Sequence, residues 1–275
     1  MTTTAAASKL FKVQRLQGGK FIPFETSIVI EKELPIYVNS EHLATASVVP
    51  SMEKEFVVGY LFGQGFIDSA GEITALEITD KGAEVTLAVA DILSSRKTKT
   101  SYRIVSGGGR TAYFETSTLP RIESDMKIAK KDIYRAMNIL FEKASLYKET
   151  GGVHSAALFD TAMNFLCVME DIGRHNTLDK VIGYMLLNKI DCINTFMVST
   201  GRMASEMVTK ICRAGIPLVA TKTAVTDKGI DIGERCGLTV IGFVRDAGSK
   251  MYTNMDVRVF QEAEMKIYTG AERLL

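Results

Sequence analysis

The sequence lacks the long apolar segments that mark a membrane-spanning or exported protein. Its apolar stretches, such as Leu238–Val244, fall far short of the ~18 residues that a transmembrane helix needs. The segment Met1–Lys9 has neither a basic start nor an apolar core, so it does not resemble a secretory signal. We therefore expect a cytoplasmic protein with no membrane contact and a flexible arm at residues 1–10.

An excess of charge of one sign is also absent. The 275 residues include 33 Lys and Arg against 32 Asp and Glu, which gives a net charge of +1. This balance excludes a chain that holds nucleic acid by bulk electrostatics, although it leaves room for a local cluster of cations. An apolar fraction of 46% with 24% charged residues is typical of globular proteins, and the length fits one large domain or two ordinary ones.

Cysteine is sparse and widely spaced. Cys167, Cys192, Cys212 and Cys236 lie twenty or more residues apart, and no CxxC pair occurs. Neighbouring cysteines therefore cannot build a zinc knuckle or a thioredoxin-type redox pair, and no metal site is predicted. We expect four reduced and mostly buried thiols, which agrees with a cytoplasmic location.

The N-terminal third has the pattern of a mostly antiparallel α+β unit. β-branched residues predict a strand over Thr26–Asn39 and an antiparallel partner over Leu43–Val49, with a turn at Asn39-Ser40. A capping serine, spaced apolar residues and a closing glycine predict a helix over Ser51–Gly65. Short strands are then predicted over Ile73–Thr79, Ala83–Ala90 and Ser101–Val105.

The pattern changes after a Gly-rich loop, and we divide the chain there. We assign residues 11–105 to an N-terminal α+β domain, 106–125 to an interdomain loop and 126–275 to a C-terminal domain. An amphipathic helix from Lys131 ends before Gly151, and a hairpin follows. The hairpin strands are Val153–Phe159 and Phe165–Met169; the later strands are Thr195–Val198, Pro217–Ala220 and Leu238–Phe243, and the later helices are His175–Asn188, a segment around Met203–Ile211, and Ala224–Cys236.

Such alternation predicts a mainly parallel sheet covered by helices. A hairpin that leads into it is the arrangement of the cytidine-deaminase-like sheet as well as of other small α/β domains. The fold class is therefore α/β, with a mixed sheet and helices on both faces in the C-terminal domain.

Hydroxyl groups and cations follow the C-terminal strands. In open α/β sheets ligands bind outside the carboxyl ends of the strands, where free helix N–H groups and cations suit phosphates. The alternative for any single loop is a solvated cation or a helix cap. Four such loops on one edge favour a shared anion site. Its candidate residues are Arg174, Ser199, Thr200, Arg202, Lys222 and Arg245.

Two histidines and two carboxylates lie near the same loops. His154 follows Gly151-Gly152, and Glu170-Asp171 precedes His175 at the start of a helix. Histidine at such a position acts as a base, a ligand or a packing residue, and a helix-entry acid pair also compensates the helix dipole. Both readings stay open for these residues.

Two enzyme classes are excluded by context. Gly107–Ala112 fits G-x-G-x-x-A, but no helical period follows it, so the dinucleotide fold lacks its helix. A zinc deaminase requires H-x-E and P-C-x-x-C, and neither occurs here.

Several segments resemble the FdhD family of formate dehydrogenase accessory proteins. They run in the family's order from Thr26 to Thr253, and Glu170–Asn176 (EDIGRHN) is the most specific. The others are Glu33–Asn39, Phe56–Phe66, Gly151–Ala157, Ser199–Val208 and Glu234–Phe243.

The resemblance implies a cytidine-deaminase-like domain with an added N-terminal domain, a homodimer and a role in sulfur transfer. Such proteins receive sulfur from a cysteine desulfurase and pass it to the guanine dinucleotide form of the molybdenum cofactor, before that cofactor enters the catalytic subunit of formate dehydrogenase. A guanine nucleotide would serve as a surrogate ligand. The residues aligned with the family's cofactor-binding stretch are Phe243, Val244, Arg245, Asp246, Ala247 and Gly248. His154, Glu170, Asp171 and His175 would orient the pterin or the incoming sulfur.

The sequence departs from the family at the sulfur-carrying cysteine. That residue belongs in the interdomain loop, which here reads Ser106, Gly107, Gly108 and Gly109. A persulfide requires an exposed thiolate, which glycine cannot supply. Either this member binds the cofactor as a non-covalent chaperone, or another cysteine substitutes, or the sequence is altered from a cysteine-bearing form. A nucleotide-processing enzyme that uses His175 with Glu170 is a further alternative.

Overall fold

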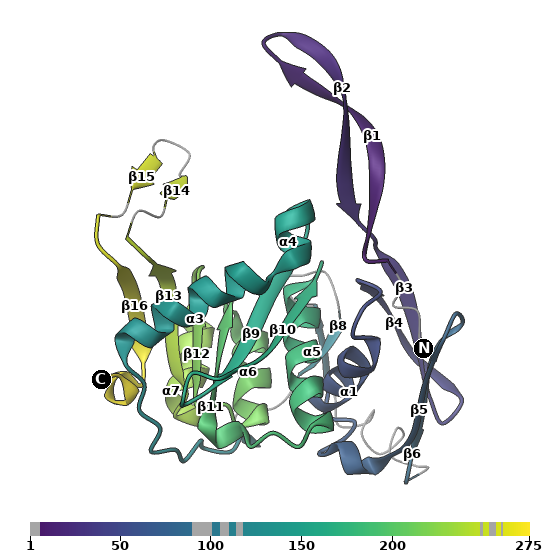
Figure 1. Cartoon of the computed structure of the whole chain (residues 1–275). Helices are drawn as coiled ribbons and strands as arrows, with labels where there is room; N and C mark the ends of the chain where they lie inside the picture. The colour runs from purple at the N-terminus through teal and green to yellow at the C-terminus, as the bar shows by residue number, and fades with distance from the viewer. Residues whose placement is uncertain are drawn as a thin grey trace.

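A six-stranded sheet forms the centre of the C-terminal part of the molecule (Figure 1). The structure is a computed structural model that describes residues 6–89, 101–104, 110–113, 118–247, 250–252, 257–259 and 261–275. The strand order is β10-β9-β11-β12-β13-β16. These strands span His154–Asp160 (β9), Phe165–Asp171 (β10), Thr195–Ser199 (β11), Leu218–Thr221 (β12), Thr239–Arg245 (β13) and Glu264–Thr269 (β16).

The sheet is mixed, as expected, but the prediction that it is mainly parallel is wrong. Only the pairings β11–β12 and β12–β13 are parallel, while β10–β9, β9–β11 and β13–β16 are antiparallel. A tight turn after Asp160 forces β9 and β10 into an antiparallel hairpin, because parallel neighbours need a long crossover. β16 joins β13 at the other edge.

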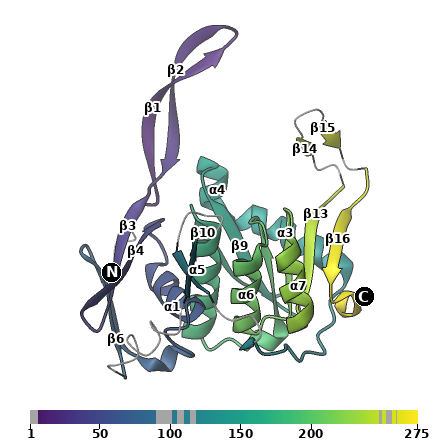
Figure 2. The ribbon, with the colours of Figure 1, turned by 180° about the vertical axis from the view of Figure 1, so that it is seen from behind.

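Helices cover both faces of the sheet, which confirms that prediction (Figures 1 and 2). α3 (Lys130–Lys143) lies on one face and buries Ile133, Met137 and Leu140 against strand residues. α5 (Arg174–Leu187), α6 (Ser205–Ala214) and α7 (Asp227–Cys236) lie on the other. The predicted helix from Lys131 to Gly151 is two helices, because the chain turns at Ala144 before α4 (Ser145–Thr150).

The described part of the N-terminal unit contains a second sheet, of order β4-β3-β6-β5, and the helix α1. Its elements are β3 (Lys32–Val38), β4 (Glu41–Val48), α1 (Glu53–Gly63), β5 (Ile73–Thr79) and β6 (Gly82–Leu87). Asn39 and Ser40 form the predicted turn between β3 and β4, both with positive φ (49° and 68°), as two-residue hairpin turns require.

Two glycines allow α1 of the N-terminal unit to pack closely against α5, which covers the large sheet. α1 crosses α5 so closely that a Cβ on Gly59 would lie 1.8 Å from the backbone oxygen of Asp179, and one on Gly183 would lie 1.8 Å from that of Glu55. The buried side chains of the N-terminal unit and of the α5 face form one hydrophobic cluster. The two predicted domains therefore share a core.

A long hairpin at the N-terminus was not predicted. β1 (Ser8–Gln17) pairs with β2 (Lys20–Val29) along its whole length and projects away from the rest of the molecule (Figure 1). Residues 8–10, assigned to a flexible arm from the sequence, instead begin this hairpin. The predicted strand Thr26–Asn39 is divided between β2 and β3.

Short elements complete the described chain. They are β7 (Ser101–Ile104), β8 (Arg110–Tyr113), β14 (Lys250–Tyr252), β15 (Val257–Val259) and the 3-10 turns η1 (Ala70–Glu72), η3 (Cys192–Asn194) and η4 (Ala271–Arg273). No helix in the described ranges is long and apolar enough to cross a membrane.

Candidate functional site

The sheet brings the predicted anion-binding residues to one edge. β11, β12 and β13 end there, at Ser199, Thr221 and Arg245. β9 starts at the same edge, because it runs antiparallel to β11. We call this edge the strand-end rim. It consists of His154, Arg174, Ser199, Thr200, Arg202, Lys222 and Arg245.

Backbone and hydroxyl groups fix the loops of the strand-end rim to one another. The Lys222 amide donates to the Ser199 carbonyl (3.0 Å), and the Thr221 hydroxyl donates to the Gly201 carbonyl (2.7 Å). The Thr200 hydroxyl accepts a hydrogen bond from the Ser155 amide (3.0 Å) and lies 3.3 Å from His154 Nδ1. A rim built in this way is preorganised, because its loops do not need to be ordered by a ligand.

Arg245 and Lys222 form the first cationic group of the strand-end rim. Arg245 is only 8% exposed, and its guanidinium donates to the carbonyls of Lys222 and Val244. Its Nε is buried and has no hydrogen-bond partner among the described residues. Lys222 Nζ lies 4.3 Å from the ring centroid of Phe141. Burial lowers the pKa of both side chains, and the charge of Arg245 lowers that of Lys222 further.

The sequence places Arg245 at a bulge in β13. Phe243 has a φ of 52°, which is rare for a bulky side chain, and the pairing with β16 shifts register between Gly242 and Arg245. Such a bulge changes which face of a strand the following side chains occupy. Val244 is buried in the α3-side core, and Arg245 is buried next to it at the strand end.

Arg174 and Arg202 form the second cationic group. Arg202 is exposed, and Arg174, half-buried at the start of α5, has its pKa lowered by burial and by the charge of Arg202. Glu206 acts in the opposite direction on Arg174. His154 also has a lowered pKa, because of burial and of Arg174. Positive charge is therefore concentrated at this end of the rim, where an anion would relieve the repulsion.

His175 is unsuited to proton transfer near neutral pH. Burial, followed by the charges of Lys210 and Arg174, lowers its pKa to about 3, and its Nε2 is buried with no partner among the described residues. The geometry therefore gives no support to a nucleotide-processing enzyme that pairs His175 with Glu170.

The carboxylates of Glu170 and Asp171, just before α5, interact with other residues of the chain. Glu170 accepts hydrogen bonds from the backbone amides of Leu146 (3.0 Å) and Tyr147 (2.8 Å), the first turn of α4. Asp171 is fully buried in an ion pair with Lys180 (2.7 Å). Helix capping accounts for Glu170 and the buried ion pair accounts for Asp171, so both carboxylates have a structural role.

The remaining residues of the predicted cofactor stretch differ in accessibility. Phe243 is half-buried, with Lys266 Nζ 4.7 Å from its ring centroid, whereas Val244 is a core residue. Asp246 and Ala247 are exposed, and Asp246 accepts a hydrogen bond from Asn138 (2.8 Å). Gly248 lies outside the described residues, as do Ser106, Gly107, Gly108 and Gly109 of the interdomain loop.

Sequence reasoning left two hydroxyl residues out of the candidate set. Thr221 and Thr223 flank Lys222, and their hydroxyls lie 3.1 Å apart. Thr223 also donates to the Thr200 carbonyl (3.4 Å), which links the β11 and β12 loops. The signal was the Thr-Lys-Thr run directly after a buried strand.

The four cysteines lie away from the strand-end rim. Cys192, in η3, and Cys236, at the end of α7, precede β11 and β13 and so lie near the opposite edge of the sheet. Cys212 is near the C-terminal end of α6, and Cys167 lies within β10. Burial raises the pKa of Cys167 to about 12. A hydrogen bond between Cys212 and Cys236 lowers the pKa of Cys236 to about 7, but that thiol is only 2% exposed.

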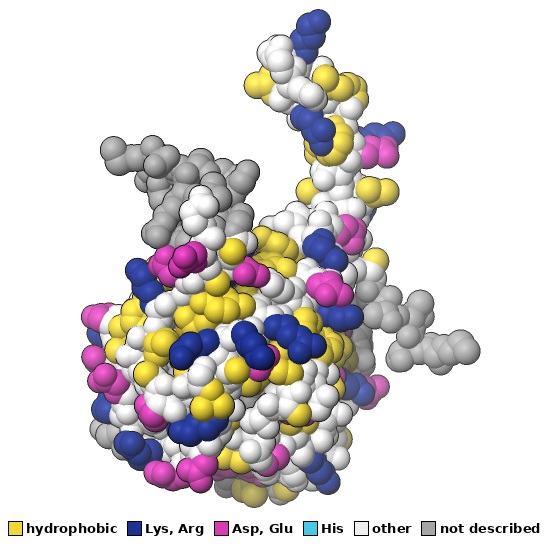
Figure 3. Space-filling view, turned by 60° about the vertical axis from the view of Figure 1, so that its left-hand side comes forward, with side chains coloured by type: hydrophobic (Ala, Val, Ile, Leu, Met, Phe, Trp, Pro, Cys, Tyr) yellow, Lys and Arg dark blue, Asp and Glu magenta, His cyan; other side chains and the backbone are white. Residues whose placement is uncertain are grey.

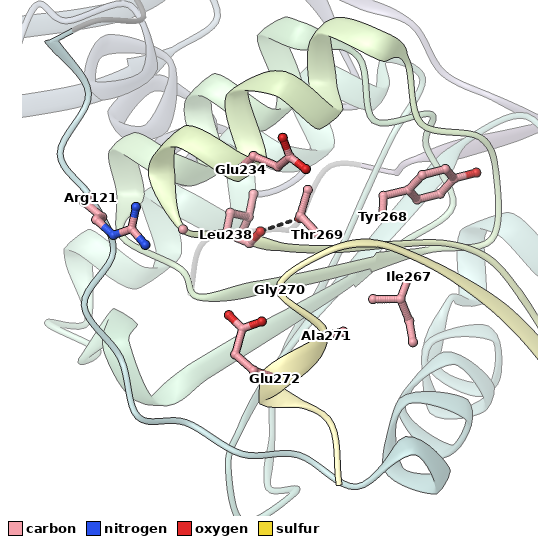
Figure 4. A pocket seen from close by; sticks show the side chains of 11 residues that line it. Arg121, Glu234, Leu238, Ile267, Tyr268, Thr269, Gly270, Ala271 and Glu272 are labelled. Atoms are coloured by element: carbon pink, nitrogen blue, oxygen red, sulfur yellow. Dashed lines mark hydrogen bonds between the residues drawn. The ribbon is translucent and has the colours of Figure 1, made fainter.

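A cavity of about 290 Å³ also lies at the opposite edge. Figure 4 shows Glu234 of α7 and Glu272 of η4 on two sides of it, with Arg121 at its border and Thr269 hydrogen-bonded to the Leu238 carbonyl. Two carboxylates against one arginine do not suit a phosphate ligand, so we place the candidate site at the strand-end rim.

Comparison with known proteins identifies the family of the chain. A model of the FdhD/NarQ family matches residues 29–275, which is most of the chain. The chain belongs to the FdhD/NarQ family. Relatives described as sulfur carrier protein FdhD include one from Bacillus pumilus, 32% identical over 250 residues (88% of this chain, 94% of the relative). Another, from Methanothermobacter thermautotrophicus, is 34% identical over 229 residues (82% and 89%).

A solved structure extends the family likeness to the fold. The crystal structure of a protein from Desulfotalea psychrophila, described as a formate dehydrogenase accessory protein, is 25% identical and has a TM-score of 0.77. The match covers 98% of this chain and all of that one. The FdhD/NarQ assignment thus makes this chain a member of a family of sulfur carrier and formate dehydrogenase accessory proteins, as the sequence predicted.

Proposed function

We propose that this chain binds the guanine dinucleotide form of the molybdenum cofactor at the strand-end rim, as cargo for the maturation of formate dehydrogenase. The observation that carries the proposal is Arg245, a cation that is more than nine-tenths buried and whose Nε has no partner among the described residues. Burial without a partner is costly, and a phosphate oxygen would satisfy this donor.

The chemistry of the neighbouring groups fits a dinucleotide. Lys222 and Arg245 would hold one phosphate, and Arg174 with Arg202 would hold another, with Thr200 as a hydroxyl partner. The exposed carboxylate of Asp246 would repel phosphate but would accept hydrogen bonds from the N–H groups of guanine. The rim therefore offers donors for phosphates and an acceptor for the base.

The wider role follows the family. We propose that a cysteine desulfurase supplies sulfur, that the catalytic subunit of formate dehydrogenase receives the cofactor, and that the protein acts as a homodimer with a cytidine-deaminase-like C-terminal domain. Support for the link to formate dehydrogenase comes from the solved relative described as its accessory protein.

A second candidate is a non-covalent cofactor chaperone. It is favoured by the positions of the four cysteines, none of which lies at the strand-end rim and three of which are at most 7% exposed. Incubation with a cysteine desulfurase and cysteine, followed by mass spectrometry, separates the two. A gain of one sulfur on a defined cysteine supports the carrier, whereas no gain with retained nucleotide binding supports the chaperone.

Nucleotide binding tests the site itself. Titration calorimetry measures the affinity of the wild type and its variants for guanosine diphosphate. Arg245→Met and Lys222→Met should each bind it about 10-fold or more weakly than the wild type, because a hydrogen bond to a charged group contributes about 1.5–3 kcal/mol. Arg121→Met, a matched change of an exposed arginine at the opposite edge, should leave the affinity unchanged. Equal affinity in all four proteins would reject this site.

A further inference from the structure

The β1–β2 hairpin exposes more apolar surface than a free ribbon tolerates. In the described part of the chain, eight of the fourteen exposed large apolar side chains belong to it. They are Leu10, Phe11, Val13, Leu16, Phe21, Ile22, Phe24 and Ile28. Figure 3 shows hydrophobic side chains, in yellow, along the projecting ribbon. An isolated two-stranded ribbon is marginally stable in water, and a large exposed apolar patch marks an interaction site.

The apolar side chains occupy both faces of the ribbon. Because side chains alternate along a strand, Phe11 and Val13 share a face with Phe24, their neighbour across the ribbon. Leu10 and Leu16 lie on the other face, where Leu16 is paired with Phe21. A flat surface would cover one face only. The occupant must therefore enclose the ribbon in a groove.

The hairpin is also cationic. It carries Lys9, Lys12, Arg15 and Lys20 against a single acid, Glu25, whereas the whole chain has a net charge of only +1. Two of the cations lie over aromatic rings of the same ribbon, with Arg15 3.4 Å from the ring centroid of Phe24. Ribbon-to-ribbon contact with a second copy would bring like charges together. A groove bordered by carboxylates complements them.

The base of the hairpin is fixed beside the strand-end rim. Val29 packs in a small cluster with Leu146 of α4 and Val153, the residue directly before His154. The Ser8 hydroxyl donates to Glu149 of α4 (2.7 Å). The hairpin therefore rises from the same end of the molecule as the rim (Figures 1 and 2), and a protein that holds its ribbon is brought over the candidate site.

We propose that the β1–β2 hairpin is the docking arm for the cofactor-free catalytic subunit of formate dehydrogenase, which holds the ribbon in an apolar groove bordered by carboxylates. The proposal rests on the proposed function, in which the rim carries that enzyme's cofactor. The family model begins at residue 29, so the arm lies outside the part of the chain that this model matches. Docking by this arm would place the acceptor over the rim when the cofactor is released.

The test measures binding of the purified, cofactor-free catalytic subunit to the immobilised full chain by biolayer interferometry. The triple variant Leu10→Ser/Leu16→Ser/Phe21→Ser removes the three most exposed apolar side chains of the ribbon. It should bind at least 10-fold more weakly than the wild type. The matched control Leu187→Ser/Leu275→Ser changes exposed leucines outside the hairpin and should bind within 2-fold of the wild type.

A charge variant distinguishes a loss of binding from misfolding of the triple variant. Lys12→Glu/Arg15→Glu leaves the exposed apolar side chains in place. It should weaken binding at least 10-fold at low salt, with a smaller salt dependence than the wild type. Binding of either hairpin variant within 2-fold of the wild type would overturn the proposal, as would a wild type that does not bind the subunit.

Two further measurements separate this proposal from the others. The hairpin variants should bind guanosine diphosphate with the same affinity as the wild type, because the rim is unchanged. A wild type that does not bind guanosine diphosphate would instead reject the proposed function. Light scattering after size exclusion should give the same mass for all variants. A wild-type dimer that dissociates in the triple variant, with enzyme binding intact, would identify a second copy as the occupant and overturn the proposal.

Discussion

Asp171 and Lys180 form a buried ion pair, and we predict that substitution of Asp171 destabilises the protein more than substitution of Lys180. Both side chains are 0% exposed and their charged atoms lie 2.7 Å apart. Asp171 also accepts hydrogen bonds from the amide of Val49 (3.0 Å), the amide of Gly173 (3.1 Å) and the side chain of Asn176 (2.9 Å). It therefore joins the end of the N-terminal sheet to the start of α5.

The magnitude follows from what each substitution leaves behind. Asp171→Asn leaves a buried ammonium without its counter-charge and points an amide group at N–H donors, and breaking a buried pair in this way costs about 3–5 kcal/mol. Lys180→Met leaves a carboxylate that keeps three N–H donors, each contributing about 1.5–3 kcal/mol to a charged acceptor. We expect Asp171→Asn to lower the free energy of unfolding by about 4 kcal/mol, and Lys180→Met by at least about 1 kcal/mol less.

Urea unfolding at pH 7 measures both values, from the midpoint and the m-value. Glu53→Gln is the control, because Glu53 pairs with Lys32 at the same distance (2.7 Å) but is partly exposed, so its loss should cost less than about 1 kcal/mol. If Lys180→Met is as destabilising as Asp171→Asn, or more so, the hydrogen bonds to Asp171 do not have the role assigned to them.

Three further predictions concern acid, packing and thiols. Burial and Lys210 lower the pKa of His175 from 6.5 to about 3, so the unfolded chain binds a proton below pH 6.5 that the folded chain does not. The free energy of unfolding should therefore fall by about 1.6 kcal/mol between pH 6.5 and 5, and urea midpoints of His175→Gln should fall less over this range. Gly59→Ala should lower the free energy of unfolding by at least about 2 kcal/mol in the same assay, since its Cβ would lie 1.8 Å from the Asp179 oxygen; a change below about 0.5 kcal/mol would contradict the close crossing. Iodoacetamide on the native protein should label Cys192 faster than the other thiols by peptide mass spectrometry, because it is half-buried while Cys167, Cys212 and Cys236 are buried; faster labelling of Cys236 would mean that its pKa outweighs its burial.

Local patterns in the sequence predicted the elements of the fold better than their pairing. The order of helices and strands from Val153 to Phe243 is confirmed, because each element has its own period or cap. β16 was missed, and it pairs with β13 across a long connection, which no local pattern reports. Pairing of this kind is decided by the packing of the whole sheet.

The sequence of the β1–β2 hairpin contains a local turn signal. Two apolar-rich runs, each without helical period, flank Gly18-Gly19, a two-residue turn in which both glycines have positive φ. Two exposed apolar faces made the segment unlike a strand of a single folded chain. A segment that is completed by another molecule does not follow the inside-outside pattern of a monomer.

The strand-end rim was predicted because it depends on topology alone. Parallel strands deliver their carboxyl ends to one edge, and Ser199, Lys222 and Arg245 follow from that rule. The roles of Glu170 and Asp171 did not follow, because the amide donors of Leu146 and Val49 lie 24 and 122 residues earlier in the chain. Only the folded structure brings those donors to the carboxylates.

A crystal structure of the protein with guanosine diphosphate bound tests the central claim most directly. The account predicts phosphate oxygens within hydrogen-bond distance of the Arg245 guanidinium and of Lys222 Nζ at the strand-end rim. Phosphates bound in the cavity beside Glu234 and Glu272 at the opposite edge would contradict it. So would phosphates bound elsewhere while Arg245 Nε still has no partner.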